Sequence, residues 1–167
     1  MTALNIETQG STHNPLDMLE EMVVANEWPF DRVSEEEMVV EINGRWCEYR
    51  LFFMWQAEVS AMQFSCQYDM KVPPGRKLAV AELLAEINPK MWLGHFDVCH
   101  DQHTPMFRQT TLLRGARAAS AEQLEDLMDI AMSECERFYP AFQFVIWGGK
   151  TPAEAVSAAI LDTVGEA

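Results

Sequence analysis

Basic side chains are scarce in this sequence. It has 12 lysines and arginines against 26 aspartates and glutamates, which gives a formal net charge of −14 at pH 7. Such a surface repels phosphate groups, so DNA, RNA and anionic membranes are disfavoured as partners. Residues 71–117 form a mild exception, with seven basic and four acidic side chains, and we interpret this segment as a solvated face.

Long apolar runs and paired cysteines are also missing. No stretch of about 18 apolar residues is present to span a bilayer, and residues 1–14 lack the basic start and apolar run of a signal peptide. None of the four cysteines (Cys47, Cys66, Cys99, Cys135) belongs to a CxxC pair. Unpaired cysteines in apolar surroundings are typical of a reducing compartment and of ordinary packing. These absences predict a cytoplasmic protein.

A catalytic constellation is lacking as well. Ser65 and Cys66 stand in no GxSxG elbow, and only four histidines are available as bases. Residues 148–151 (GGKT) end like a P-loop, but that motif needs a glycine where Phe144 stands. We therefore predict a protein without enzymatic activity or cofactor. A third and weaker hypothesis is an unrecognised hydrolase, which a pocket containing a carboxylate or cysteine with a strongly shifted pKa would support.

What is present suffices for one folded unit. A chain of 167 residues, of which 49% are hydrophobic, buries a core without help from disulfides or metal. The polar residues 1–13 predict a flexible tail. Residues 14–167 predict a single α+β domain, because no repeat, linker or low-complexity segment interrupts them.

Helical spacing predicts four helices. Asn14 is a suitable cap for the first, since a proline follows it. Leu78 belongs to the apolar row of the second. Ser120 opens the third with a capping-box pattern, and Pro140 must kink or restart that helix. The predicted helices cover residues 14–28, 78–88, 120–147 and 152–164.

Alternating apolar and polar residues predict an antiparallel sheet. Phe64 and its alternate neighbours are apolar, whereas Gln63 and Ser65 are polar, so the sheet has one dry and one wet face. Asn43-Gly44 predicts a tight turn with positive φ. Several strands are apolar on both sides, which leaves open which face is buried. The predicted strands cover residues 30–33, 38–43, 45–55, 61–70, 93–99 and 106–114, giving the order α-β-β-β(-β)-α-β-β-α-α with helices packed on one face.

One segment is a candidate metal site. On a strand, His95, Asp97 and Cys99 share one face, and the hairpin over residues 95–103 could bring His103 near them. All four are plausible zinc ligands. Their spacing matches no familiar site, however, and a polar strand face followed by a turn explains the same residues.

A surplus of large apolar side chains indicates a candidate interface. Aromatic residues and methionine are enriched at protein interfaces, although most apolar stripes are simply buried. The last predicted helix has few polar residues, so it is either buried or docked on a partner. The candidate interface residues are Trp46, Phe52, Met54, Trp92, Trp147, Val156 and Ile160.

Several segments together resemble the YbjN-domain family of bacteria. They are residues 28–32 (WPFDR), 44–51 (GRWCEYRL), 93–97 (LGHFD), 124–127 (LEDL), 133–143 (SECERFYPAFQ), 147–150 (WGGK) and 161–163 (LDT). The resemblance covers roughly residues 15–165, and its C-terminal part is the most specific. It implies a sensory-transduction regulator with no established catalytic residue or cofactor.

The resemblance also implies a fold similar to that of type III secretion chaperones. Those small acidic α+β proteins have the order α-β-β-β-α-β-β-α, form homodimers and hold extended segments of client proteins. The predicted apolar helix after Gly149 departs from their pattern, which puts an identical dimer or client groove in doubt.

The leading hypothesis is therefore a homodimeric protein-binding module of the cytoplasm with a regulatory or chaperone-like role and an unidentified client. Such a module would dock a strand or helix on an exposed sheet face or edge. The alternative is a metal- or small-ligand-sensing domain that uses the hairpin over residues 95–103.

Overall fold

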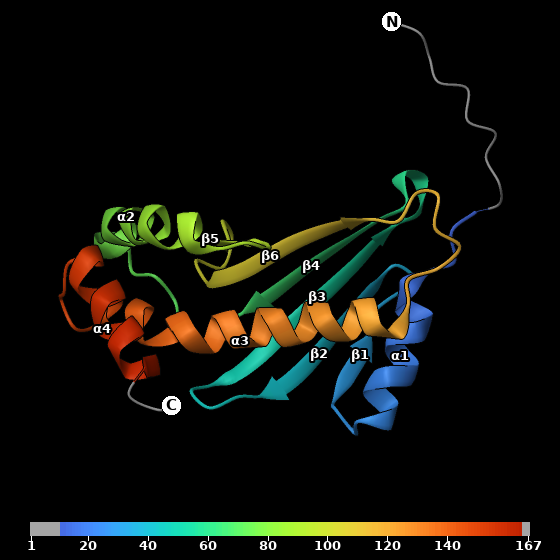
Figure 1. Ribbon diagram of the computed structural model, residues 1–167, viewed down its shortest axis with the longest axis horizontal. Helices are drawn as coiled ribbons and strands as arrows, with labels where there is room; N and C mark the ends of the chain where they lie inside the picture. Colours follow the sequence, from blue (N-terminus) through green and yellow to red (C-terminus); the bar gives the residue numbers. More distant parts are fainter. Residues whose placement is uncertain (1–10, 165–167) are drawn as a thin grey trace, which may run out of the picture.

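Four helices and six strands follow one another along residues 11–164, which are the residues that the computed structural model describes (Figure 1). The helices are α1 (Pro15–Ala25), α2 (Lys77–Ile87), α3 (Ala121–Ile146) and α4 (Pro152–Val164). The strands are β1 (Phe30–Arg32), β2 (Glu37–Asn43), β3 (Glu48–Gln56), β4 (Ala61–Gln67), β5 (His95–Val98) and β6 (Pro105–Leu112). The predicted α+β order is confirmed, and β1 is the additional strand.

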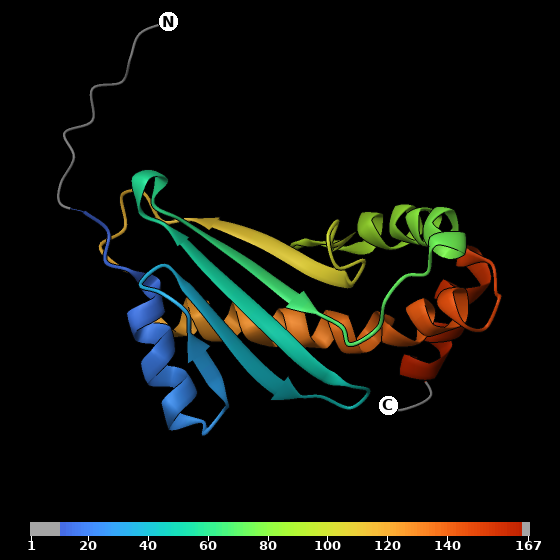
Figure 2. The same cartoon turned by 180° about the vertical axis from the view of Figure 1, so that it is seen from behind.

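The six strands form one antiparallel sheet in the order β1-β2-β3-β4-β6-β5. Helix α3 runs across one face of this sheet and α1 packs on the same face, as the two opposite views show (Figures 1 and 2). Helices α2 and α4 gather at one end of the molecule, beside the C-terminal end of α3. The prediction that helices pack on one face of the sheet is confirmed.

Alternation decides which face is buried. In β3 the inward residues Leu51 and Phe53 are at most 1% exposed, whereas Arg50 before them and Met54 after them are exposed. In β4 the inward Phe64 is 2% exposed. This period of two places every second side chain under α3. The sequence did not decide which face of the sheet is buried, and the structure shows that it is the face carrying Leu51 and Phe64.

Helix α3 is stabilised at its start as predicted. The Ser120 hydroxyl accepts a hydrogen bond from the Gln123 N–H, and the Gln123 side chain accepts one from the Ser120 N–H. Of the two predicted alternatives at Pro140, a kink or a restart, the restart is wrong, because one helix continues through it to Ile146. Proline removes a single backbone hydrogen bond, and the burial of its neighbours Phe138 and Phe142 outweighs that loss.

The turn between β2 and β3 differs from the prediction. It is a four-residue loop, and Gly44 is not among the residues with positive φ. Glycine is needed there because a Cβ atom would collide with the Tyr49 ring and the Glu136 carboxylate. The Gly44 N–H donates to the Cys47 carbonyl at 2.9 Å, which closes the loop. The Arg45 N–H donates to the Glu136 carboxylate at 2.6 Å, so the loop is also anchored on α3.

The start of the chain and the second helix bring two further results. Of the predicted tail, residues 1–10 lie outside the described residues, while Thr12 donates to the carbonyls of Leu113 and Ala116. The inward row of α2 is Val80, Leu83 and Ile87 rather than the row containing Leu78, which is 74% exposed.

Among residues 11–164, none of the helices combines the length and hydrophobicity that crossing a membrane requires.

Candidate functional site

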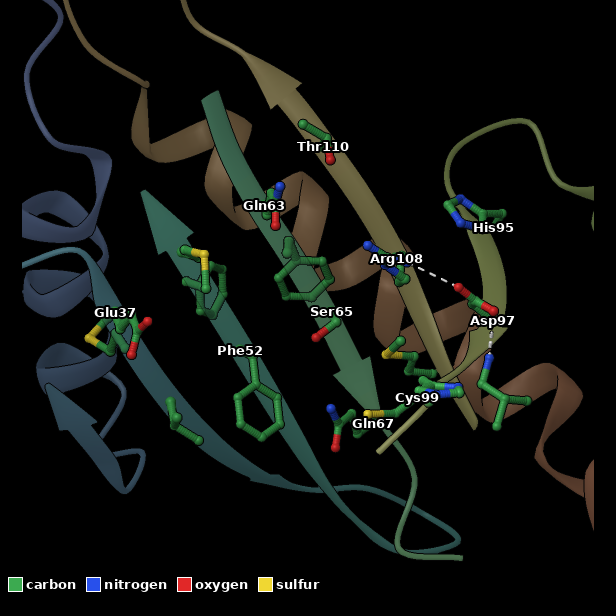
Figure 3. A pocket seen from close by; sticks show the side chains of 18 of the residues that line it. Glu37, Phe52, Gln63, Ser65, Gln67, His95, Asp97, Cys99, Arg108 and Thr110 are labelled. Carbon is green, nitrogen blue, oxygen red and sulfur yellow. Dashed lines mark hydrogen bonds and ion pairs between the residues drawn. The ribbon is translucent and has the colours of Figure 1, made fainter. Parts of the chain in front are cut away.

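The face of the sheet that points away from α1 and α3 carries a broad hollow of about 590 Å³. We call this side the open face. Its floor is made of outward side chains from five strands, β2 to β6, and Figure 3 shows them from the solvent side. The apolar lining residues are Val39, Phe52, Met54 and Met106; the polar ones include Gln63, Ser65, Gln67, Thr110, His95, Asp97, Cys99 and Arg108.

The apolar part of the hollow comes from β3. Phe52 is half-buried and Met54 is 39% exposed, and both alternate with the buried residues of the same strand. The Arg50 guanidinium lies 5.7 Å from the centre of the Phe52 ring and 3.9 Å from the Glu41 carboxylate. Phe52 and Met54, two predicted interface residues, therefore lie together on the open face.

The charged part of the hollow is an ion pair between neighbouring strands. The Arg108 Nη1 donates to Asp97 Oδ2 at 3.0 Å, and the backbone N–H of Val98 donates to Asp97 Oδ1 at 2.8 Å. Both side chains are about half-exposed. Since each oxygen of Asp97 already has a donor, this carboxylate is held in place and largely neutralised.

The predicted metal ligands do not come together. Asp97 is engaged by Arg108, and His103 faces a second, 260 Å³ pocket between α2 and the β5–β6 turn, where Cys99 and His100 also lie. Within the described part of the chain, no three histidine, cysteine or carboxylate side chains gather as a metal site would require. The second pocket is also smaller than most small-molecule sites, so this pocket does not support the ligand-sensing hypothesis.

The other predicted interface residues lie away from the hollow. Trp46 stacks on Tyr139 of α3 with ring centres 6.1 Å apart, and Arg45 covers it at 4.7 Å. Trp92 and Trp147 are 76% and 61% exposed, at the α2–β5 connection and at the end of α3.

The prediction that Val156 and Ile160 of α4 are interface residues is wrong. Val156 is 5% exposed and Ile160 packs against the core, because α4 docks on α2 and α3 of its own chain. An apolar helix is either buried or docked on a partner, and here burial within the chain accounts for both residues.

Two of the cysteines are poorly suited to act as nucleophiles. Burial raises the pKa of the Cys47 thiol to about 12 and raises the pKa of the Cys135 thiol well above its usual range. A nucleophilic cysteine needs the opposite shift, since the thiolate is the reactive form. The shifts therefore point away from the hydrolase hypothesis.

The P-loop-like segment is a boundary between two helices. The Thr151 hydroxyl accepts a hydrogen bond from the Glu154 N–H, and the Glu154 carboxylate accepts one from the Thr151 N–H. Gly149 has φ +64°, a conformation that suits the end of α3. Residues 148–151 thus end one helix and cap the next.

Sequence reasoning missed the contribution of β6 to the hollow. Met106, Arg108 and Thr110 were not singled out, because their place beside Ser65 and Gln63 follows from the β4–β6 pairing. The alternation of β4 did signal that Gln63 and Ser65 face outward. The order of strands, which brings β6 next to β4, leaves no trace in local sequence.

Three comparisons with known proteins bear on the family. The family model YbjN, described as "Putative bacterial sensory transduction regulator", matches residues 15–144. A search of curated proteins finds no match. Among solved structures, one from E. coli described as "YbjN, a putative transcription regulator" aligns with a TM-score of 0.52 and 16% identity, over 81% of this chain and 92% of that one. At this identity the structural likeness shows the fold, and the family match shows that the chain belongs to the YbjN family.

Proposed function

We propose that this chain is a non-enzymatic regulatory module of the bacterial cytoplasm that acts by binding another protein on the open face of its sheet. One observation carries the proposal: the helices of residues 11–164 leave this face uncovered, and it is hollowed and partly apolar around Phe52 and Met54. Exposed aromatic and methionine side chains are enriched where proteins bind one another. The description of the family as a regulator supports the same reading.

A protein suits this surface better than nucleic acid does. The net charge of −14 repels phosphates over most of the molecule. The E. coli structure is described as that of "a putative transcription regulator". If this chain also affects transcription, its charge favours an action through contact with a protein of the transcription machinery rather than with DNA.

The cytoplasmic location and the regulatory role have separate support. The four cysteines are free, as expected in a reducing compartment. In the hollow, Asp97 is paired with Arg108 rather than free to act as a base. A chaperone-like hold on an extended client remains part of the proposal, because an uncovered antiparallel sheet suits such a client.

We also propose that the chain forms a homodimer through the helical end of the molecule. The Arg76 guanidinium donates to the Val145 carbonyl at 2.8 Å, which joins the start of α2 to the end of α3. Leu78 and Trp147, two residues beyond each of these, are 74% and 61% exposed. Exposed apolar side chains on elements that gather at one end of the molecule favour association.

Site-specific photo-crosslinking tests the docking face. A photo-reactive amino acid replaces Ser65, in the middle of the hollow, or Glu125, on the exposed side of α3. In the native cytosol we expect protein adducts from position 65 that are absent from position 125. The change Met54→Glu should reduce these adducts at least about fivefold, since it places a charge in the apolar part of the hollow. Equal adducts from both positions, or none from position 65, would show that the open face is not the docking site.

A further inference from the structure

Strand β6 is longer than the strand beside it. β6 has eight residues and β5 has four, and their pairing ends where His95 meets Arg108. Gly94, with φ +68°, turns the chain away just before β5 begins. Among the described residues, the C-terminal half of β6 is therefore paired with a strand on its β4 side only, as Figures 1 and 3 show. We call the backbone of residues 109–112 on its other side the free edge.

The register identifies the backbone groups on the free edge. The Leu113 N–H donates to the Ser60 carbonyl at 2.7 Å, and the Tyr68 N–H donates to the Pro105 carbonyl at 3.1 Å. In an antiparallel ladder, hydrogen-bonded pairs recur every second residue. The odd-numbered residues of β6 therefore bond toward β4, and the even-numbered ones point to the other side. Within residues 11–164, no strand pairs with Thr110 and Leu112 on that other side.

The free edge is accessible and unprotected. Thr110 is exposed and Leu112 is 76% exposed. The Gln109 side chain donates to the Thr110 carbonyl at 3.1 Å, but among residues 11–164 no acceptor is assigned to the N–H groups of Thr110 and Leu112. Edge strands are usually blunted by lysine, proline or a bulge, and residues 109–112 (QTTL) contain no lysine or proline.

The charge around the free edge is opposite to that of the molecule. Residues 102–121 contain three arginines and no acidic side chain. Arg108 is paired with Asp97, while Arg114 and Arg117 are exposed and form no ion pair with the described residues. The short turn between β3 and β4 contains one acidic residue, Glu58. A second copy of this strand would bring arginines toward arginines, whereas an acidic segment would be attracted.

We propose that the free edge of β6 pairs with an extended, acidic segment of the partner protein, which adds a seventh strand to the sheet. This inference rests on the proposed function and states which kind of segment the module recognises. The N–H groups of Thr110 and Leu112 donate to the added strand, and its acidic side chains lie near Arg114 and Arg117. Its outward side chains continue the floor of the hollow beyond Thr110.

The probe is a fluorescent octapeptide in which valine alternates with glutamate, and binding is followed by anisotropy. We expect saturable binding that weakens with salt, at least about tenfold weaker binding when lysine replaces glutamate, and loss of binding when alternate backbone nitrogens are methylated. Slower hydrogen exchange at Thr110 and Leu112 should accompany binding. Exchange unchanged at both positions, or equal binding of the lysine peptide, would overturn the proposal.

The register supplies matched variants. Thr110→Pro removes an N–H that points to the free edge, so it should weaken peptide binding about tenfold while the protein stays folded. Thr110→Val keeps that N–H and should bind normally. Thr111→Pro removes an N–H that bonds toward β4, and it should instead lower the unfolding midpoint, which checks the register. Normal binding by a folded Thr110→Pro protein would contradict edge pairing.

Two other occupants are outcomes of the same experiments. Doubling of the mass by light scattering that Thr110→Pro abolishes would make a second copy the occupant. Faster exchange at Thr110 in a chain that begins at residue 11 would make residues 1–10 the occupant. Either result overturns the proposal of an acidic partner segment. Partner adducts from position 65 that persist in Thr110→Pro would leave the proposed function standing and refute edge pairing alone.

Discussion

At the scale of single residues, Arg32 joins the edge of the sheet to the first helix. Its guanidinium donates to the carbonyls of Leu16, Ser34 and Glu35 and to the carboxylates of Asp17 and Glu20, at 2.9–3.2 Å. The side chain is 19% exposed, so solvent only partly replaces these bonds. A planar group with five donors meets this set of acceptors, and an ammonium cannot.

The change Arg32→Lys should therefore destabilise the protein by about 2 kcal/mol, because an ammonium cannot donate to these five acceptors at once. The measurement is the free energy of unfolding from urea titration. Arg50→Lys is the control: Arg50 is exposed and its carboxylate partner lies 3.9 Å away, so the loss should stay below about 0.5 kcal/mol. Equal losses in the two variants would show that the Arg32 network contributes little.

Gly44 offers a second test at this scale. A Cβ atom there would meet the Tyr49 ring and the Glu136 carboxylate, so Gly44→Ala should cost about 2 kcal/mol by displacing the loop from α3. A Cβ atom at Gly75 would have no other atom within 4 Å. Gly75→Ala should leave stability unchanged or raise it by up to about 1 kcal/mol, because alanine lowers the conformational entropy of the unfolded chain. Thermal unfolding of both variants distinguishes a close approach from a general need for glycine.

Cys47 gives a prediction about pH. Burial raises its pKa from 9.0 to about 12, so at pH 8 its thiolate fraction in the folded protein is roughly a thousandfold lower than for an ordinary cysteine. Iodoacetamide should accordingly label Cys47 very slowly until the pH approaches 12. Mass spectrometry measures the rate, and labelling in urea is the reference. Similar rates in folded and unfolded protein would contradict the burial of this thiol.

At the scale of elements, the local sequence predicted correctly those features that depend on interactions between residues close together in the chain. The alternation around Phe64 and the capping box at Ser120 are features of neighbouring residues, and both are confirmed. The restart at Pro140 was wrong because packing of the adjacent aromatic rings maintains the helix. The tight turn at Gly44 was wrong because contacts with α3, about 90 residues away in sequence, hold that loop.

Part of the candidate site was predictable for the same reason. Phe52 and Met54 were identified from the alternation of their own strand. Arg108 and Thr110 were missed, since only the pairing of β4 with β6 places them on the same floor. The mistake at Val156 arose because an apolar helix has the same composition whether it covers its own core or a partner.

Helix α4 provides the test at the element scale. It lies beyond residue 144, where the family match ends, and Val156 is 5% exposed while Leu161 is 70% exposed. Val156→Asp should destabilise the protein by about 3 kcal/mol, because it buries a charge against α2 and α3. Leu161→Asp should change stability by less than about 0.5 kcal/mol. If the urea midpoint of unfolding is the same for Val156→Asp as for the wild-type protein, α4 does not dock as described.

At the scale of the whole molecule, function and stability are assigned to different surfaces. One face of the sheet is covered by α1 and α3 and supplies the core, while the open face and the free edge of β6 remain available to a partner. The acidic remainder of the surface discourages non-specific contacts with nucleic acid. The arginine-bearing segment beside the free edge then gives a local attraction that the rest of the molecule lacks.

The proposed dimer can be tested against this division. If the helical end forms the dimer, the mass by light scattering should be twice 19.0 kDa and should fall on dilution. Trp147→Ser should give the monomer mass at every concentration, because it removes the large exposed apolar side chain at the end of α3. Trp92→Ser is the control, since Trp92 is 76% exposed but precedes β5 rather than ending α3. A dimer that persists in Trp147→Ser would move the contact to another surface, and crosslinking from position 65 would then show whether the open face is that surface.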